Sequence, residues 1–243
     1  YNLTKTIIDT VKNHPSHPKT ILGGPIITSE PKVIFESIKP DFGVLGEGED
    51  VVLNLLNTVN SKKDLNSVKG IIYSKDNVSV ITKKPTPPKN LDALPFPDYE
   101  ALGLTEWLDN LHPNTSGSYG EFDYPRIYPL IAGRSCPFQC TFCYHDNNFY
   151  RTRSMDNIME EISLAVKKYH INVLIMQDEI FAINKERIKE FCKRLNLLKQ
   201  ETGQEIKWFA QMRVNGVDEE LLKIMKESGC HVVGYGFESF SDA

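Results

Sequence analysis

The sequence predicts an α/β protein with parallel strands joined by helical crossovers, and two observations predict it. Short apolar runs, such as residues 42–45 and 173–176, are followed within two residues by glycine or a carboxylate residue. Longer stretches with apolar residues at helical spacing, such as residues 185–202, come next along the chain. Strand–turn–helix units repeated in this way favour a parallel sheet covered by helices.

Composition places limits on the class of protein. The 243 residues are 40% hydrophobic and 25% charged, which allows a packed core. The net charge of −4 gives no basic excess for nucleic acid or for an anionic membrane surface. The apolar runs are too short to span a bilayer. Three of the five cysteines are clustered, which does not resemble a disulfide framework, so we expect a reducing, cytoplasmic setting.

Residues 1–63 are predicted to form a first, partial domain. Its expected elements are helix 3–11, strand 20–22, helix 31–38, strand 42–45 and helix 51–59. The chain begins with Tyr1 rather than Met and stops just after a predicted strand, so we expect a fragment of a longer polypeptide.

Residues 64–121 are predicted to connect two domains. A hairpin is expected over residues 68–73 and 78–82, and residues 83–97 hold five prolines, which indicates a semi-extended linker. A short helix within a loop is expected over residues 107–122.

Residues 122–243 are predicted to form a truncated parallel (βα) partial barrel. Its expected strands are 127–132, 173–176, 208–212 and 232–235, and its expected helices are 154–169, 185–202 and 218–228. In parallel α/β folds the active site lies at the carboxyl ends of the strands. The polar residues that follow these strands should therefore meet there.

The most informative motif is a loop with three cysteines at C-x3-C-x2-C spacing, Cys136, Cys140 and Cys143. Three thiolates can hold three irons of a cubane cluster, which normally has four cysteine ligands. A missing fourth ligand leaves one iron open for chemistry. The alternatives are a zinc site closed by His145, a disulfide and three core thiols, although these cysteines do not follow an apolar face.

With Phe142 and Tyr144 around the last cysteine, this loop resembles the signature of the radical S-adenosylmethionine (SAM) superfamily. The resemblance implies a [4Fe–4S] cluster on the three cysteines, with the amino and carboxylate groups of SAM on the fourth iron. Reductive cleavage of SAM would then give a 5′-deoxyadenosyl radical. The resemblance covers residues 122–243, about two-thirds of the family's six-unit partial barrel.

The same resemblance suggests further SAM-binding residues. Tyr144 would contact the adenine, or else be a core aromatic. Asp178 or Glu179 would hold the methionyl ammonium, although Gln-Asp-Glu departs from the common Gly-Gly-Glu and leaves open which one points inward. Arg213 would meet the methionyl carboxylate or a substrate acid, or be a surface residue. Glu238, with Ser239, would line the ribose or substrate side.

The first domain resembles the C-terminal half of a cobalamin-binding domain fused to radical enzymes. The matching segments are residues 21–25, 44–49 and 91–97. Gly23 and Gly24 would then pass the nucleotide tail of cobalamin, or be simple tight turns. The Asp-x-His-x-x-Gly loop of many cobalamin proteins is absent, so the chain would hold about half of such a site.

The leading hypothesis is therefore a cobalamin-subfamily radical SAM enzyme for methyl transfer or ring formation. It would act on a small molecule, with flavodoxin or ferredoxin as electron donor. One alternative is a methylthiotransferase acting on tRNA, but that class has extra cysteines in its first domain, and residues 1–122 contain none. The others are a non-catalytic iron–sulfur protein and a zinc-binding module.

Overall fold

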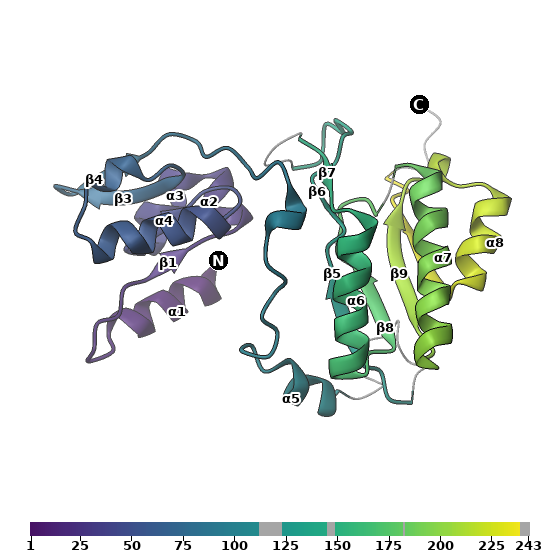
Figure 1. The fold of residues 1–243 in the computed structure, drawn as a ribbon. Coiled ribbons are helices and arrows are strands. Elements are labelled where there is room, and N and C mark those ends of the chain that lie inside the picture. Colours follow the sequence, from purple (N-terminus) through teal and green to yellow (C-terminus); the bar gives the residue numbers. More distant parts are fainter. Residues whose placement is uncertain (112–122, 145–148, 182, 239–243) are drawn as a thin grey trace. The chain divides into compact units, whose positions relative to one another are not determined.

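The computed structural model describes residues 1–111, 123–144, 149–181 and 183–238 (Figure 1). The chain divides into two compact units, Tyr1–Pro88 and Lys89–Ala243. The division falls within the proline-rich segment, whose prolines favour an extended backbone. Each unit is described separately.

The first unit is a four-stranded sheet flanked by helices. Its strands β1 (Ile21–Leu22), β2 (Phe42–Val44), β3 (Ile71–Lys75) and β4 (Val78–Ile81) lie side by side in chain order, with β1 and β2 parallel. Its helices are α1 (Asn2–Lys12), α2 (Pro25–Ser29), α3 (Pro31–Ile38) and α4 (Glu49–Asn60). All predicted elements of this part are present, and the short helix α2 is an addition.

The hairpin, expected in the connecting segment, instead belongs to the first sheet. Strand β3 pairs antiparallel with β2, and Val44 lies opposite Ile71. The turn residues Asp76 and Asn77 have φ angles of 50° and 62°, which suit the two-residue turns of tight hairpins. Because Ile71 is fully buried, the hairpin completes a core rather than a linker.

The second unit contains a parallel sheet in the order β10-β9-β8-β5, which confirms the predicted fold class. Its strands are β5 (Ile127–Leu130), β8 (Val173–Met176), β9 (Lys207–Met212) and β10 (Cys230–Tyr235). The helices that connect them are α6 (Met155–Tyr169), α7 (Lys185–Thr202) and α8 (Glu219–Glu227), and α5 (Leu104–Asp109) precedes β5. Sequential order of parallel strands is the arrangement from which a barrel curls.

Alternate residues of these strands face opposite sides of the sheet. Leu174 and Trp208 belong to the large core shared with α6, α7 and α8, whereas Val173 and Phe209 belong to a small separate cluster. Figure 1 shows α6 and α7 running alongside the strands. Because side chains alternate between the two faces along each strand, one face of the sheet is covered by helices. The candidate functional side chains lie at the ends of the strands.

Capping residues set the ends of the helices. The hydroxyl of Ser154 accepts a hydrogen bond from the backbone N–H of Asn157 at 3.1 Å and begins α6. The carboxylate of Asp218 does the same for Leu221 at 2.8 Å and begins α8. Gly203, with φ of 67°, ends α7. These local signals explain why the predicted bounds lie so close to the observed ones.

A two-stranded ribbon that the sequence does not predict closes the base of the cysteine loop. Strand β6 (Gly133–Arg134) pairs antiparallel with β7 (Arg151–Thr152). A Cβ atom at Gly133 would lie 3.0 Å from the carbonyl oxygen of Arg151, so the close approach of the two strands favours glycine. Among the described residues no helix is long and apolar enough to cross a bilayer.

Candidate functional site

A cavity of about 810 Å³ opens at the carboxyl ends of the four parallel strands. Each strand contributes to its wall through the segment that follows it, as the sequence predicts. Its polar and sulfur-bearing lining residues include Cys136, Cys140, Cys143, Glu179, Arg213 and Glu238. Six residues expected from the sequence are thereby brought together from four segments of the chain.

The three thiols lie near one another on this wall. Cys136 and Cys140 are half-buried and Cys143 is exposed, and all three are free. The pKa of Cys143 is raised, first by loss of hydration and then by the neighbouring Cys140 and Glu179. The backbone N–H of Cys143 donates to the carbonyl of Cys140 at 3.1 Å, so a turn joins these two cysteines.

The arrangement of the thiols bears on the choice between a single metal ion and a cubane. Within the described residues, no three His, Cys, Asp or Glu side chains converge on one point as the ligands of one metal ion do. A cubane takes each thiolate on a different iron, so its ligands surround a volume rather than a point. His145, the tempting fourth zinc ligand, lies outside the described residues.

Asp178 and Glu179 are adjacent in sequence but have different surroundings. Glu179 is exposed and lines the cavity. Asp178 is only 5% exposed, and its Oδ2 accepts a hydrogen bond from the backbone N–H of Ala132 at 3.1 Å. Burial raises the pKa of Asp178 to about 7, against the opposing effect of the Ala132 and Gly133 backbone. Of the two carboxylates, Glu179 is therefore the one available to a ligand in the cavity.

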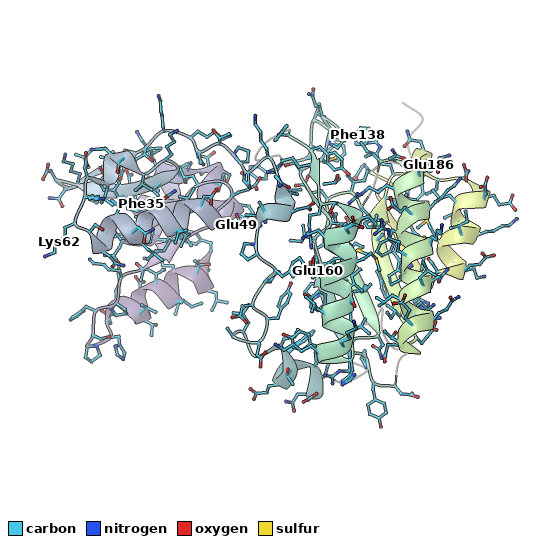
Figure 2. The ribbon with its side chains drawn as sticks, viewed as in Figure 1. Phe35, Glu49, Lys62, Phe138, Glu160 and Glu186 are labelled. Atoms are coloured by element: carbon cyan, nitrogen blue, oxygen red, sulfur yellow. The ribbon has the colours of Figure 1, made fainter. Side chains whose placement is uncertain are left out.

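Arg213 faces the cysteine loop across the cavity. Its guanidinium carbon lies 4.0 Å from the centroid of the Phe138 ring, and its Nη1 lies 3.9 Å from the sulfur of Cys140. Phe138 and Glu186, labelled in Figure 2, lie towards the same end of this unit. Phe138 is not among the residues predicted from the sequence, although its position inside the C-x3-C segment could have indicated it.

The remaining expected residues are divided. Glu238 lines the cavity with the cysteines, whereas Tyr144 is 49% exposed and is not among the residues that line it. Ser239 lies outside the described residues. In the first unit, Gly23 and Gly24 follow β1 and are exposed, and Gly24 has a φ of 93°. Apart from the chain neighbours of each glycine, no described residue lies within 4 Å of a Cβ built at Gly23 or Gly24.

The two other cysteines take no part in the site. Cys192 is buried on α7, and Cys230 is packed against the same core. Burial raises the pKa of Cys230 to about 12. A thiol that stays protonated is a poor metal ligand.

Comparison with known protein families gives the loop its context. Residues 130–243 match the Radical SAM superfamily, and the match includes every residue of the cavity wall. Residues 130–243 belong to the radical SAM superfamily. The predicted family is confirmed, and its three-cysteine loop is the segment around which the cavity forms.

Curated proteins extend the likeness of this radical SAM protein to nearly its whole length. It is 31% identical over 241 residues to the uncharacterized methyltransferase PH0819 of Pyrococcus horikoshii, covering 97% of this chain and 49% of that protein. It is 32% identical over 229 residues to the anaerobic magnesium-protoporphyrin IX monomethyl ester cyclase of Rubrivivax gelatinosus, covering 90% and 38% respectively. The chain thus spans half or less of the length of these two relatives.

Solved structures support the fold. The chain superposes on the radical SAM methyltransferase TsrM of Kitasatospora setae, solved with cobalamin and a [4Fe–4S] cluster, with a TM-score of 0.71 and 16% identity. That comparison covers 98% of this chain and 44% of TsrM. The cobalamin-dependent radical enzyme OxsB gives a TM-score of 0.72 at 23% identity, covering 98% of this chain and 34% of OxsB. The fold is that of cobalamin-dependent radical SAM enzymes.

Proposed function

We propose that this chain is part of a radical SAM enzyme that reductively cleaves SAM for cobalamin-dependent methyl transfer or ring formation. The observation that carries the proposal is the placement of Cys136, Cys140 and Cys143 on one cavity at the carboxyl ends of parallel strands. The names of its relatives, a methyltransferase and a cyclase, support this reading over a tRNA methylthiotransferase.

The three thiols are suitable ligands for a [4Fe–4S] cluster. They are free, and two of them are half-buried, so cluster edges would be partly shielded from water. When bound there, such a cluster supplies the electron that breaks a carbon–sulfur bond of SAM and releases a 5′-deoxyadenosyl radical. Thiols that must stay reduced fit a cytoplasmic setting, with flavodoxin or ferredoxin as the donor.

Glu179 is the proposed partner of the methionyl ammonium. Its carboxylate is on the cavity wall and within electrostatic reach of Cys143, so a SAM molecule near the thiols would present its ammonium to it. Glu238 stands on the same wall and is proposed to contact the ribose or the substrate. Tyr144 remains a candidate for the adenine, although it lies outside the cavity wall.

Gly23 and Gly24 are proposed to lie beside the nucleotide tail of cobalamin. Both are exposed, and in the part of the chain that the structure describes nothing beyond their chain neighbours lies within 4 Å of a Cβ built at either one. The backbone after β1 is therefore open to a close approach, as strand ends are in doubly wound sheets. An exposed backbone of this kind fits the close approach of a cobalamin tail.

The function can be tested with the full-length protein, purified without oxygen and reconstituted with iron and sulfide. Added SAM and a low-potential reductant should yield 5′-deoxyadenosine, and the protein should retain added cobalamin. The Cys140→Ala variant is the matched control and should form no 5′-deoxyadenosine. Zinc in place of iron and sulfide would instead indicate a binding module.

A further inference from the structure

Arg213 contacts the cysteine loop at two places. Its guanidinium carbon lies 4.0 Å from the centre of the Phe138 ring. Its Nη1 lies 3.9 Å from the sulfur of Cys140, within the range of an N–H···S hydrogen bond. Phe138 stands between Cys136 and Cys140, so one guanidinium meets both the middle of the loop and one of its thiols.

The two contacts are geometrically compatible and support each other. A guanidinium is planar and carries five N–H groups in a rigid fork, so it can stack one face on an aromatic ring while its edge donates elsewhere. The face of Phe138 attracts the cation and holds its position. This leaves an edge N–H directed at the sulfur of Cys140.

The charged residues on the cavity wall make Arg213 important for the electrostatics of the cavity. Two acidic residues, Glu179 and Glu238, line the same wall. Among the described residues that line the cavity, Arg213 is the only arginine or lysine. A cluster in this cavity would therefore have two carboxylates and one guanidinium among its wall residues.

We propose that Arg213 raises the reduction potential of a [4Fe–4S] cluster held by the three cysteines, with Phe138 as the residue that positions it. The inference rests on the proposed function, since it needs the cluster. Hydrogen bonds to cysteine sulfur and nearby positive charge both stabilise the reduced cluster, which carries the extra electron. The sequence suggested a carboxylate of SAM or substrate as the partner of Arg213, and the contacts point to a sulfur instead.

The test is a redox titration of the cluster, followed by electron paramagnetic resonance, in the full chain without SAM. We expect Arg213→Gln to hold as much iron and sulfide as the wild type. We also expect its equilibrium for cluster reduction to fall at least tenfold, which is 59 mV to lower potential for a one-electron couple. Arg194→Gln is the matched control. It removes the same charge from α7, where Arg194 pairs with Asp156 and Glu190, and should leave the potential unchanged.

A second variant addresses the positioning role. Phe138→Leu keeps an apolar side chain and removes the aromatic face, so the guanidinium is no longer held and the potential should fall in the same direction. If Arg213→Gln fails to retain iron, the Phe138→Leu variant tests the proposal instead. An unchanged reduction potential in Phe138→Leu would then overturn the proposal.

The outcomes separate this inference from the proposed function. A normal cluster in Arg213→Gln with the wild-type potential, together with weaker SAM binding, would overturn the tuning role and assign Arg213 to the SAM carboxylate. Failure of the wild type to assemble any [4Fe–4S] cluster would overturn the proposed function itself. A lowered potential with unchanged SAM affinity would support the inference.

Discussion

Asp178 accepts a hydrogen bond from the backbone N–H of Ala132 at 3.1 Å and so ties the end of β8 to the base of the cysteine loop. The same carboxylate is buried beside Gly133, where an added Cβ would lie 3.3 Å from Oδ1. Its sequence neighbour Glu179 lines the cavity. Of these two adjacent carboxylates, one is therefore buried in a contact with the backbone and the other is exposed to the cavity.

Replacement of Asp178 should destabilise the second unit when the hydrogen bond to Ala132 is lost. Asp178→Ala leaves a buried backbone N–H unpaired, at a cost of about 1–3 kcal/mol in the free energy of unfolding. Asp178→Asn keeps an acceptor oxygen for the same N–H and is the matched control. Urea unfolding followed by tryptophan fluorescence measures this unit alone, because Trp107 and Trp208 both belong to it. Equal stability of the two variants would contradict the role of the hydrogen bond.

The stability of this unit should fall as the pH rises from about 4 to about 7. Burial raises the pKa of Asp178 from 3.8 to about 7, so between these values the folded state binds a proton that the unfolded state has released. The stabilisation is complete below the lower pKa and is lost as the pH rises through the upper one. A loss of a few kcal/mol relative to Asp178→Asn is expected. A pH-independent difference between the two proteins in urea unfolding would show that Asp178 does not titrate in this way.

Local sequence signals predicted most of the fold, because the helices and strands of the second unit are bounded by capping and turn residues. Ser154, Gly203 and Asp218 mark helix ends through hydrogen bonds or a positive φ that depend only on nearby residues. The hairpin was predicted in the connecting segment instead of the first sheet, because the prediction used local signals only. Its turn at Asp76 and Asn77 is local, whereas its pairing with β2 depends on residues about thirty positions away.

Two parts of the candidate site could be predicted because their signals are visible in the sequence. The cysteine spacing indicates a cluster, and the ends of parallel strands indicate where Glu179, Arg213 and Glu238 meet. Which of Asp178 and Glu179 is buried and which lines the cavity was not predictable from the sequence. It depends on which carboxylate packs against the backbone of another strand. The contact between Arg213 and Phe138 joins the end of β9 to the loop after β5, and no local pattern reports it.

A buried ion pair should be important for the packing of α6 on β5. Glu161 is 3% exposed, accepts a hydrogen bond from the hydroxyl of Tyr128 at 2.9 Å and pairs with the guanidinium of Arg153. Glu161→Ala leaves that guanidinium without its carboxylate and, among the described residues, with hydrogen bonds to Asn157 and Ile131 only, so we expect a loss of about 3–5 kcal/mol in the free energy of unfolding. Urea unfolding followed by tryptophan fluorescence is the measurement.

The control for that prediction is an exposed ion pair of the same unit. Glu219 pairs with Lys223 one helical turn later on α8, and both are largely exposed. Glu219→Ala should change the free energy of unfolding by less than about 1 kcal/mol. Comparable losses in Glu161→Ala and Glu219→Ala would mean that burial does not strengthen the first pair.

Each of the three loop cysteines should be necessary for the cluster. Substitution of Cys136, Cys140 or Cys143 by alanine removes one of three protein ligands, and we expect the iron and sulfide content after anaerobic reconstitution to fall to background. Cys230→Ala is the control, since burial raises the pKa of Cys230 to about 12 and its thiol stays protonated. Full iron content in Cys140→Ala, or its loss in Cys230→Ala, would contradict the assignment.

Glu179 should contribute to SAM affinity through its charge. Glu179→Gln keeps the shape of the side chain and removes the negative charge, so the bond to the methionyl ammonium weakens. A charge-assisted hydrogen bond is worth about 1.5–3 kcal/mol, so we expect SAM to bind roughly 10- to 100-fold more weakly. Titration with SAM, followed through its effect on the resonance spectrum of the reduced cluster, measures the affinity. Glu186→Gln removes an equal charge from the first turn of α7, where Glu186 pairs with Lys189, and should leave the affinity unchanged. Equal affinities in the two variants would assign the ammonium to another partner.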